Sequence, residues 1–243
     1  MPRRSATTKG ELPPFDGVLD GDELFVGWDQ SINHAGVVVL DGQGRLALLL
    51  GLVERVADER PGFPALTHIM PDCEPDPDCY DVARLSIVSA WIGEAMGAIR
   101  RPAWRDSWRG VLALEDYAYG MARGAHQIGE MGGAVRRQIK RHGWPLRLHD
   151  PTSVKLFATG RGDAKKPEVI RAVLERWGVD FTTLHPKVGE DLADAYTLAR
   201  MALTEYRVRQ GVVDLTELTE AERRVFLRTT KARPTNLLDR PFA

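Results

Sequence analysis

Three short apolar segments near the start of the chain constrain its fold most strongly. Residues 23–29 (ELFVGWD), 34–40 (HAGVVVL) and 45–53 (RLALLLGLV) are rich in β-branched and other apolar side chains, and short polar turns separate them. Such segments predict a three-stranded meander. None of the apolar runs approaches the ~18–20 residues that a membrane span requires, so no association with a membrane is expected.

Helical and strand patterns alternate over the rest of the chain. Apolar residues at three- and four-residue steps predict amphipathic helices, and two short apolar runs, 111–114 and 146–148, predict buried strands. The predicted helices lie at about 82–99, 125–142, 151–160, 166–177, 189–203 and 217–228. Strands that are followed by helices alternating with strands predict an α/β protein, in which helices cover the faces of a mixed sheet.

The net charge of −1 over 243 residues conceals a basic region between residues 123 and 176. This region has twelve Arg or Lys against five Asp or Glu, a local charge of +7 that favours a polyanionic partner. The alternative is that these arginines only solvate helix faces. The N-terminus has no apolar stretch behind its first arginines, which predicts a cytoplasmic protein without a secretory signal.

The segment 54–79 is acidic and rich in Pro, and we expect it to form a solvated loop. It contains Cys73 and Cys79 in a C-x5-C spacing, and the second ligand pair of a zinc site is missing. A structural metal is therefore not expected there.

Four carboxylates fall where an active site is expected. Asp29 ends the first predicted strand, Glu115 follows the apolar run 111–114, and Asp191 and Asp194 lie three residues apart on one face of a helix. Like charges that are brought together need a cation, and carboxylate oxygens suit Mg²⁺ or Mn²⁺. Two such ions can activate water and stabilise the leaving oxygen of a phosphodiester. Alternatively, each acid caps a helix or pairs with an arginine.

Four segments, in their order along the chain, resemble the motifs of RuvC-type Holliday-junction resolvases. They are residues 25–41 with Asp29, 112–120 with Glu115, the basic segment 151–166, and Asp191-Leu-Ala-Asp-Ala-Tyr. The resemblance implies an RNase H-like fold, a five-stranded mixed sheet flanked by helices on both faces. It also implies an endonuclease that resolves four-way DNA junctions by symmetric phosphodiester hydrolysis.

The resemblance further implies roles for individual residues. The four acids would bind two Mg²⁺ ions, with Mn²⁺ as a substitute. Lys155 and Lys166 would contact the phosphate backbone or support the transition state, with Lys165 competing for the second role. Many relatives have a Phe three residues after the second acid, where this chain has Ala118. The residues expected to bind DNA are Tyr117, Tyr119, Arg123, Lys155, Arg161, Lys165 and Lys166.

The neighbouring tyrosines can stack on an unpaired base or pack in the core. Family members act as homodimers, and the Gly-rich helix 125–142 is expected at the dimer interface, with packing on its own sheet as the alternative.

The resemblance covers residues 23–204. Residues 1–22 are expected to form an N-terminal extension, and 205–243 a basic helix and tail whose arginines can add DNA contacts. Two other functions stay open. One is a junction- or RNA-binding relative with broader branched-substrate activity or little nuclease activity. The other is an actin-like phosphotransferase, although the chain lacks a convincing second Gly-rich phosphate loop.

Overall fold

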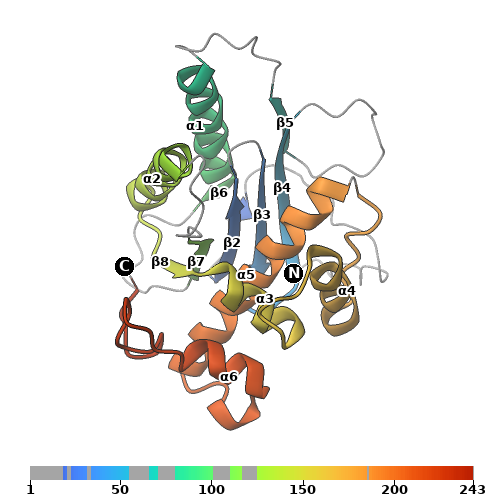
Figure 1. Ribbon diagram of the computed structural model, residues 1–243, viewed down its shortest axis with the longest axis vertical. Coiled ribbons are helices and arrows are strands. Elements are labelled where there is room, and N and C mark those ends of the chain that lie inside the picture. Colours follow the sequence, from blue (N-terminus) through green and yellow to red (C-terminus); the bar gives the residue numbers. More distant parts are fainter. Residues whose placement is uncertain are drawn as a thin grey trace.

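A mixed six-stranded sheet forms the centre of the computed structural model, which describes residues 19–20, 23–31, 34–54, 66–70, 80–100, 110–116, 125–184 and 186–242 (Figure 1). The strand order is β5-β4-β3-β2-β7-β8. The strands are β2 (Leu24–Gln30), β3 (Ala35–Asp41), β4 (Leu46–Glu54), β5 (Leu66–Met70), β7 (Gly110–Glu115) and β8 (Leu146–His149). Two short strands, β1 (Leu19–Asp20) and β6 (Ile99–Arg100), pair separately.

The predicted meander is confirmed, because β2, β3 and β4 pair antiparallel in that order. The two later strands then extend the sheet on the other side of β2, with β7 parallel to β2 and β8 parallel to β7. These five strands form the sheet of the predicted RNase H-like fold.

The sixth strand corrects the prediction of a loop over residues 54–79. Residues 66–70, whose sequence is Leu-Thr-His-Ile-Met, form β5 and pair parallel with β4. This stretch contains no Pro, so its backbone can complete the hydrogen bonds at the edge of β4. The two cysteines lie outside the described residues.

Helices cover both faces of the sheet, as predicted (Figure 1). On one face lie α1 (Tyr80–Ala98) and α2 (Ala125–Arg141), and on the other α3 (Pro151–Thr159), α4 (Lys166–Trp177) and α5 (Pro186–Arg209). A 3₁₀ turn, η1 (Leu215–Glu217), and α6 (Glu220–Phe226) follow. No helix in the described part of the chain has the length and hydrophobicity to cross a membrane.

Two predicted helix boundaries are shifted. Helix α5 begins at Pro186 rather than near Gly189, because Pro is well suited to the first turn of a helix. The helix predicted at 217–228 begins at Glu220, because the preceding residues form η1 and the Thr219 hydroxyl caps α6 by accepting a hydrogen bond from the Glu222 amide.

Side-chain alternation along the strands divides the core into two layers. Phe25 of β2 and Val111 of β7 face α5, whereas Val26 and Trp28 face α1. Trp28 meets Trp91 of α1 edge to face at a centroid distance of 5.3 Å. Because Asp29 and Glu115 continue the series that faces α5, both carboxylates point toward that helix.

Two glycines allow α5 to lie directly on the sheet. A Cβ atom on Gly27 of β2 would lie 1.8 Å from the carbonyl oxygen of Ala195, and one on Gly36 of β3 would lie 2.7 Å from the carbonyl carbon of Asp191. Both clashes are with backbone, which cannot move aside without displacing the helix. The glycines therefore set the distance between α5 and the strand that carries Asp29.

Gly27→Ala is expected to lower the free energy of unfolding by at least about 2 kcal/mol, because the new methyl group pushes α5 away from the sheet. Urea unfolding followed by circular dichroism measures the loss. Gly93→Ala in α1 is the matched control, because a Cβ there meets no atom within 4 Å. We expect the control to be neutral or stabilising by up to about 1 kcal/mol, as for Gly→Ala in helices generally. Equal stabilities of the two variants would contradict the close approach of α5.

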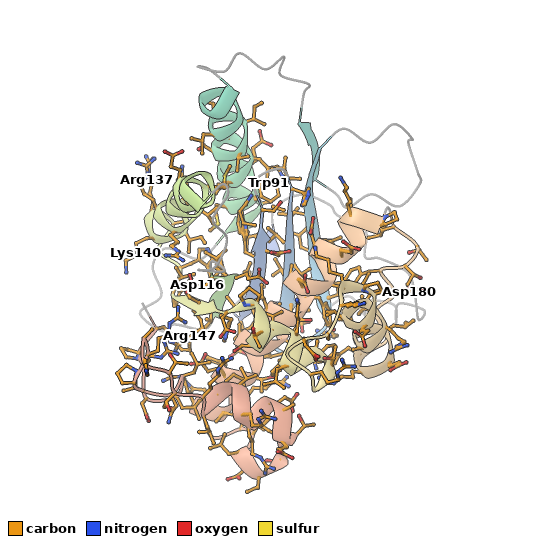
Figure 2. The ribbon with its side chains drawn as sticks, viewed as in Figure 1. Trp91, Asp116, Arg137, Lys140, Arg147 and Asp180 are labelled. Atoms are coloured by element: carbon orange, nitrogen blue, oxygen red, sulfur yellow. The ribbon has the colours of Figure 1, made fainter. Side chains whose placement is uncertain are left out.

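The C-terminal segment after α6 is anchored to the edge of the sheet at β8 (Figure 2). Buried Arg147 of β8 pairs with buried Glu205 of α5 through two hydrogen bonds of 2.6 and 2.9 Å, and it also donates to the Arg240 carbonyl. Arg233 forms an ion pair with Asp116 and donates to the carbonyl of Leu148. Arg233, one of the tail arginines considered for DNA contacts, is thus engaged inside the protein.

Candidate active site

The first two predicted acids lie side by side at the carboxyl end of the central strands. Trp28 of β2 is in register with Leu114 of parallel β7, so the next residues, Asp29 and Glu115, are neighbours on the face toward α5. Asp29 is 9% exposed. Placing a second carboxylate beside buried Asp29 is costly unless something compensates for their charge.

Helix α5 brings the other two acids to the same place. Asp191 and Asp194 are 3% and 7% exposed, and their spacing of three residues puts both on the helix face that lies on the sheet. Gly36 is the residue of β3 in register with Asp29, and its missing side chain lets α5 come close at Asp191. The structure therefore brings together all four acids that the sequence singled out.

Three of these acids have raised pKa values. Burial raises the pKa of Asp29 well above its ordinary value, and Glu115, Asp194 and Asp191 raise it further. The pKa of Glu115 is raised to about 8, first by burial and then by Asp194. Burial is also the main cause that raises the pKa of Asp194 to about 6. Neighbouring carboxyl groups with raised pKa values are typical of a site that can hold a cation or a proton.

Two lysines approach the acids from neighbouring helices. The Lys166 ammonium, on the first residue of α4, lies 3.4 Å from Asp191 Oδ1 and 3.6 Å from Glu190 Oε2. Burial opposes the charge of Lys166, but the carboxylates outweigh it and raise its pKa. Lys155 of α3 lowers the pKa of Glu115 and of Asp194.

The other predicted contact residues are distributed differently. Lys165, which competes with Lys166 for the role at the transition state, is exposed. Its backbone amide donates a hydrogen bond to the side chain of Glu168 in the first turn of α4. Exposed Arg161 is paired with Asp163 and Glu168 at 3.3 Å each. The predicted DNA-binding residues Tyr117, Tyr119 and Arg123 lie outside the described residues.

The acid after Glu115 has a structural role. Asp116 is buried and is held by two guanidinium groups, Arg136 of α2 at 2.6 Å and Arg233 of the tail. Its carboxylate therefore faces away from the acid cluster, toward α2 and the tail (Figure 2).

A histidine that the sequence analysis did not single out contacts the cluster. His34 Nδ1 lies 2.7 Å from Ser31 Oγ and 3.1 Å from Asp191 Oδ2. Both residues belong to the turn between β2 and β3, directly after Asp29. The signal that could have found them is their position, since polar side chains that follow a strand-ending carboxylate lie at the same edge of the sheet.

The donor chemistry of the four acids fits a hard divalent cation. Their oxygens are the ligands that Mg²⁺ and Mn²⁺ prefer, and buried Asp191 Oδ2, although 3.1 Å from His34 Nδ1, accepts no well-aligned hydrogen bond from the described residues. In the described ranges, however, no three Asp, Glu, His or Cys side chains are arranged closely enough to hold a metal ion. Charge coupling acts over longer distances than metal coordination, so the raised pKa values and the open arrangement are compatible.

Both the sequence and the fold of this chain are similar to those of known proteins. No protein-family profile matches the chain. A curated relative, "Crossover junction endodeoxyribonuclease RuvC" of Nocardia farcinica, is 28% identical over 130 residues, which are 50% of this chain and 69% of the relative. This chain is therefore similar in sequence to a RuvC resolvase.

One solved structure supports the fold. A Thermus thermophilus RuvC in complex with Holliday junction substrate aligns with a TM-score of 0.50 and 21% identity, over 78% of this chain and 96% of the other. A second T. thermophilus RuvC structure has a TM-score of 0.49 and 24% identity, over 77% and 96% of the two chains. The structural match to the complex is evidence for the RNase H-like fold alone.

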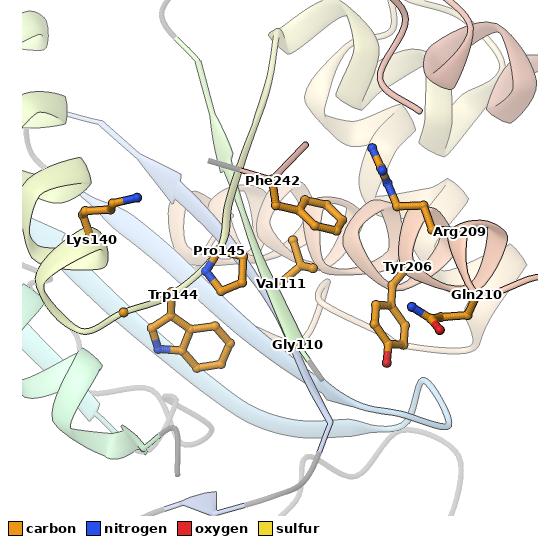
Figure 3. A pocket seen from close by; sticks show the side chains of 10 residues that line it. Gly110, Val111, Lys140, Trp144, Pro145, Tyr206, Arg209, Gln210 and Phe242 are labelled. Atoms are coloured by element: carbon orange, nitrogen blue, oxygen red, sulfur yellow. The ribbon is translucent and has the colours of Figure 1, made fainter. Parts of the chain in front are cut away.

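A separate cavity of about 490 Å³ opens at the opposite end of β7, beside Gly110 (Figure 3). Three of its ten lining residues are aromatic, namely Trp144, Tyr206 and Phe242. Gly110 precedes Glu115 by five residues, which is about 17 Å along a strand, so this cavity is separate from the acid cluster.

The raised pKa of Glu115 predicts how stability depends on pH in the absence of metal. The folded state favours the neutral acid, so this contribution is complete below pH 4.5 and is lost as the pH rises through about 8. Glu115→Gln removes the titration. We expect the variant and the parent to be about equally stable at pH 5, and the variant to gain about 1 kcal/mol for each pH unit above that until about pH 8.

Thermal unfolding in EDTA between pH 5 and 8.5 measures this difference. Added Mg²⁺ should stabilise the parent at pH 8 and reduce the advantage of Glu115→Gln, since a cation replaces the missing compensation. If the difference in melting temperature between parent and variant stayed constant from pH 5 to 8.5, Glu115 would not be held neutral in the folded protein.

Proposed function

We propose that this chain is an endonuclease that resolves four-way DNA junctions by cutting strands symmetrically with the help of a divalent metal. The observation that carries the proposal is the cluster of four acids, three of them buried, with Lys155 and Lys166 around it. The similarity to a crossover junction endodeoxyribonuclease supports it. So does the fold shared with a protein solved in complex with Holliday junction substrate.

The proposed metal ligands are Asp29, Glu115, Asp191 and Asp194, and two Mg²⁺ ions, or Mn²⁺ in their place, are the expected cofactors. When bound, such ions supply an activated water and stabilise the leaving oxygen of a phosphodiester. The acids must lose their protons to bind them, so metal affinity should rise with pH through the pKa values of Asp194 and Glu115, about 6 and about 8.

The cations around the acids are proposed to contact the DNA. We expect the Lys155 and Lys166 ammonium groups to contact the phosphate at the site of cleavage, where positive charge stabilises the transition state. Tyr117 and Tyr119 are proposed to stack on bases at the junction centre. Arg123, Arg161 and Lys165 are proposed to contact the phosphate backbone. The nuclease domain is assigned to residues 23–204.

Two symmetric cuts require two active sites, and we propose a homodimer that forms through α2. The helix carries Gly133 on an exposed position where a Cβ atom would meet nothing within 4 Å. Arg137 and Lys140 are exposed on the same helix (Figure 2). A twofold dimer would use this face twice. Light scattering after gel filtration tests the stoichiometry, and Gly133→Trp should shift a dimer toward monomer.

The deciding experiment compares a labelled synthetic four-way junction with a linear duplex of matched sequence, in Mg²⁺, in Mn²⁺ and in EDTA. The proposal requires paired symmetric nicks in the junction that depend on metal, with little cutting of the duplex. Tight binding of the junction without cleavage in either metal would refute the enzyme and leave a structure-specific DNA-binding protein.

A further inference from the structure

A groove between α6 and α3 lies outside the acid cluster. Its volume is about 990 Å³, and it is open along one side to solvent. Thr152 and Leu156 of α3 form one wall, and Arg223, Arg224 and Arg228 lie along the other. An open groove of this size suits an extended ligand better than a small molecule that must be enclosed.

Two of the groove arginines have side chains that are not engaged by the described part of the protein. The guanidinium groups of Arg223 and Arg224 make no hydrogen bond or ion pair with the part of the chain that the structure describes. This contrasts with Arg147, Arg209 and Arg233, which all bind acids and fix the tail. Folding therefore leaves the charge of Arg223 and Arg224 available to a partner.

Two acids line the groove, and one of them is paired within the protein. Asp163 pairs with Arg161 at 3.3 Å. Glu220 is the one groove acid for which the described residues provide no ion pair. The groove is thus positive overall and complementary to a polyanion.

Helix α3 connects the groove to the active site. Arg228 Nη1 lies 3.4 Å from both Asp150 Oδ1 and Ser153 Oγ at the start of α3. His149 of β8 is in register with Glu115 of β7, and Asp150, the next residue, caps the start of α3. Arg228 of the groove thus contacts the residues that directly follow the strand beside Glu115.

We propose that this groove binds the phosphate backbone of the duplex arm that leads away from the cleaved phosphate, with Arg223 and Arg224 as its contacts. The inference rests on the proposed function, since it takes the junction as the substrate. It adds a second, sequence-independent binding surface built from the segment after α5. Arm binding by this surface contributes affinity and orientation, and it takes no part in the chemical step.

The test measures junction binding in Ca²⁺ as a function of salt, with the full chain, its Arg223→Ala/Arg224→Ala variant and a matched control. The control, Arg45→Ala/Arg171→Ala, removes two exposed arginines that already have acid partners, one of them in the hairpin far from Asp29. The groove variant should lose at least about tenfold in affinity at 0.1 M salt, and its salt dependence should weaken by about two ions per protomer.

The arm phosphates provide the specific readout. On a junction with arms of about 20 base pairs the groove variant should bind more weakly than the control, whereas the two should bind alike when neutral methylphosphonate linkages replace the phosphates within about six steps of the cleaved one. An equal salt dependence of variant and control on long arms would overturn the inference while leaving the proposed function intact. Absence of junction binding by the unaltered protein would refute both.

Discussion

Asp29→Asn is expected to lower the rate of junction cleavage by at least about a thousandfold. The carboxylate is buried next to Glu115 at the centre of the cluster, and Asn removes the negative charge that would hold the cation there. A metal ion supplies several kcal/mol of transition-state stabilisation, and about 4 kcal/mol corresponds to a thousandfold in rate. Single-turnover cleavage of a labelled junction measures the effect.

Measurements of junction and metal binding distinguish a loss of catalysis from a loss of the folded active site. Asn has nearly the shape of Asp and removes charge repulsion, so Asp29→Asn should bind the junction at least as tightly as the parent in EDTA. Calorimetry with Mn²⁺ should show weaker metal binding. Asp239→Asn, at an exposed tail position, is the control and should leave both properties unchanged. If Asp29→Asn kept a tenth of the parent's rate, the assignment of Asp29 as a metal ligand would be wrong.

The position of the acids could be predicted because it depends on local sequence pattern. Apolar runs that end in Asp29 and Glu115 place both at strand ends, and the spacing of Asp191 and Asp194 puts them on one helix face. The meander, the helices and the two covered faces follow from the same periodicities. These are short-range properties that a single sequence shows directly.

Other features depend on contacts between distant segments, which periodicity does not show. Strand β5 exists because β4 has an open edge, and the role of Gly36 depends on a helix that follows it by about 150 residues. The contact of His34 with Asp191 arises in the same way. Arg233 was considered for DNA binding because charge alone does not distinguish a solvent-facing arginine from one that pairs with Asp116.

Arg147→Ala is expected to lower the free energy of unfolding by about 3–5 kcal/mol. Glu205 is completely buried, and Arg147 gives it two of its hydrogen bonds, so the variant leaves a buried charge with only Arg209 beside it. Arg147 also donates to the Arg240 carbonyl, so the same substitution should loosen the tail. Urea unfolding gives the stability, and limited proteolysis after residue 228 gives the state of the tail.

A double variant distinguishes the ion pair from simple loss of packing. Arg147→Met/Glu205→Leu removes both charges and keeps most of the apolar volume, so it should recover most of the stability that Arg147→Ala loses, because replacing a whole buried pair is often nearly neutral. The tail carbonyls that Arg147 held would still lack a donor, so proteolysis should stay faster than in the parent. Stability of Arg147→Ala within about 1 kcal/mol of the parent would instead mean that water or Arg209 compensates for Glu205.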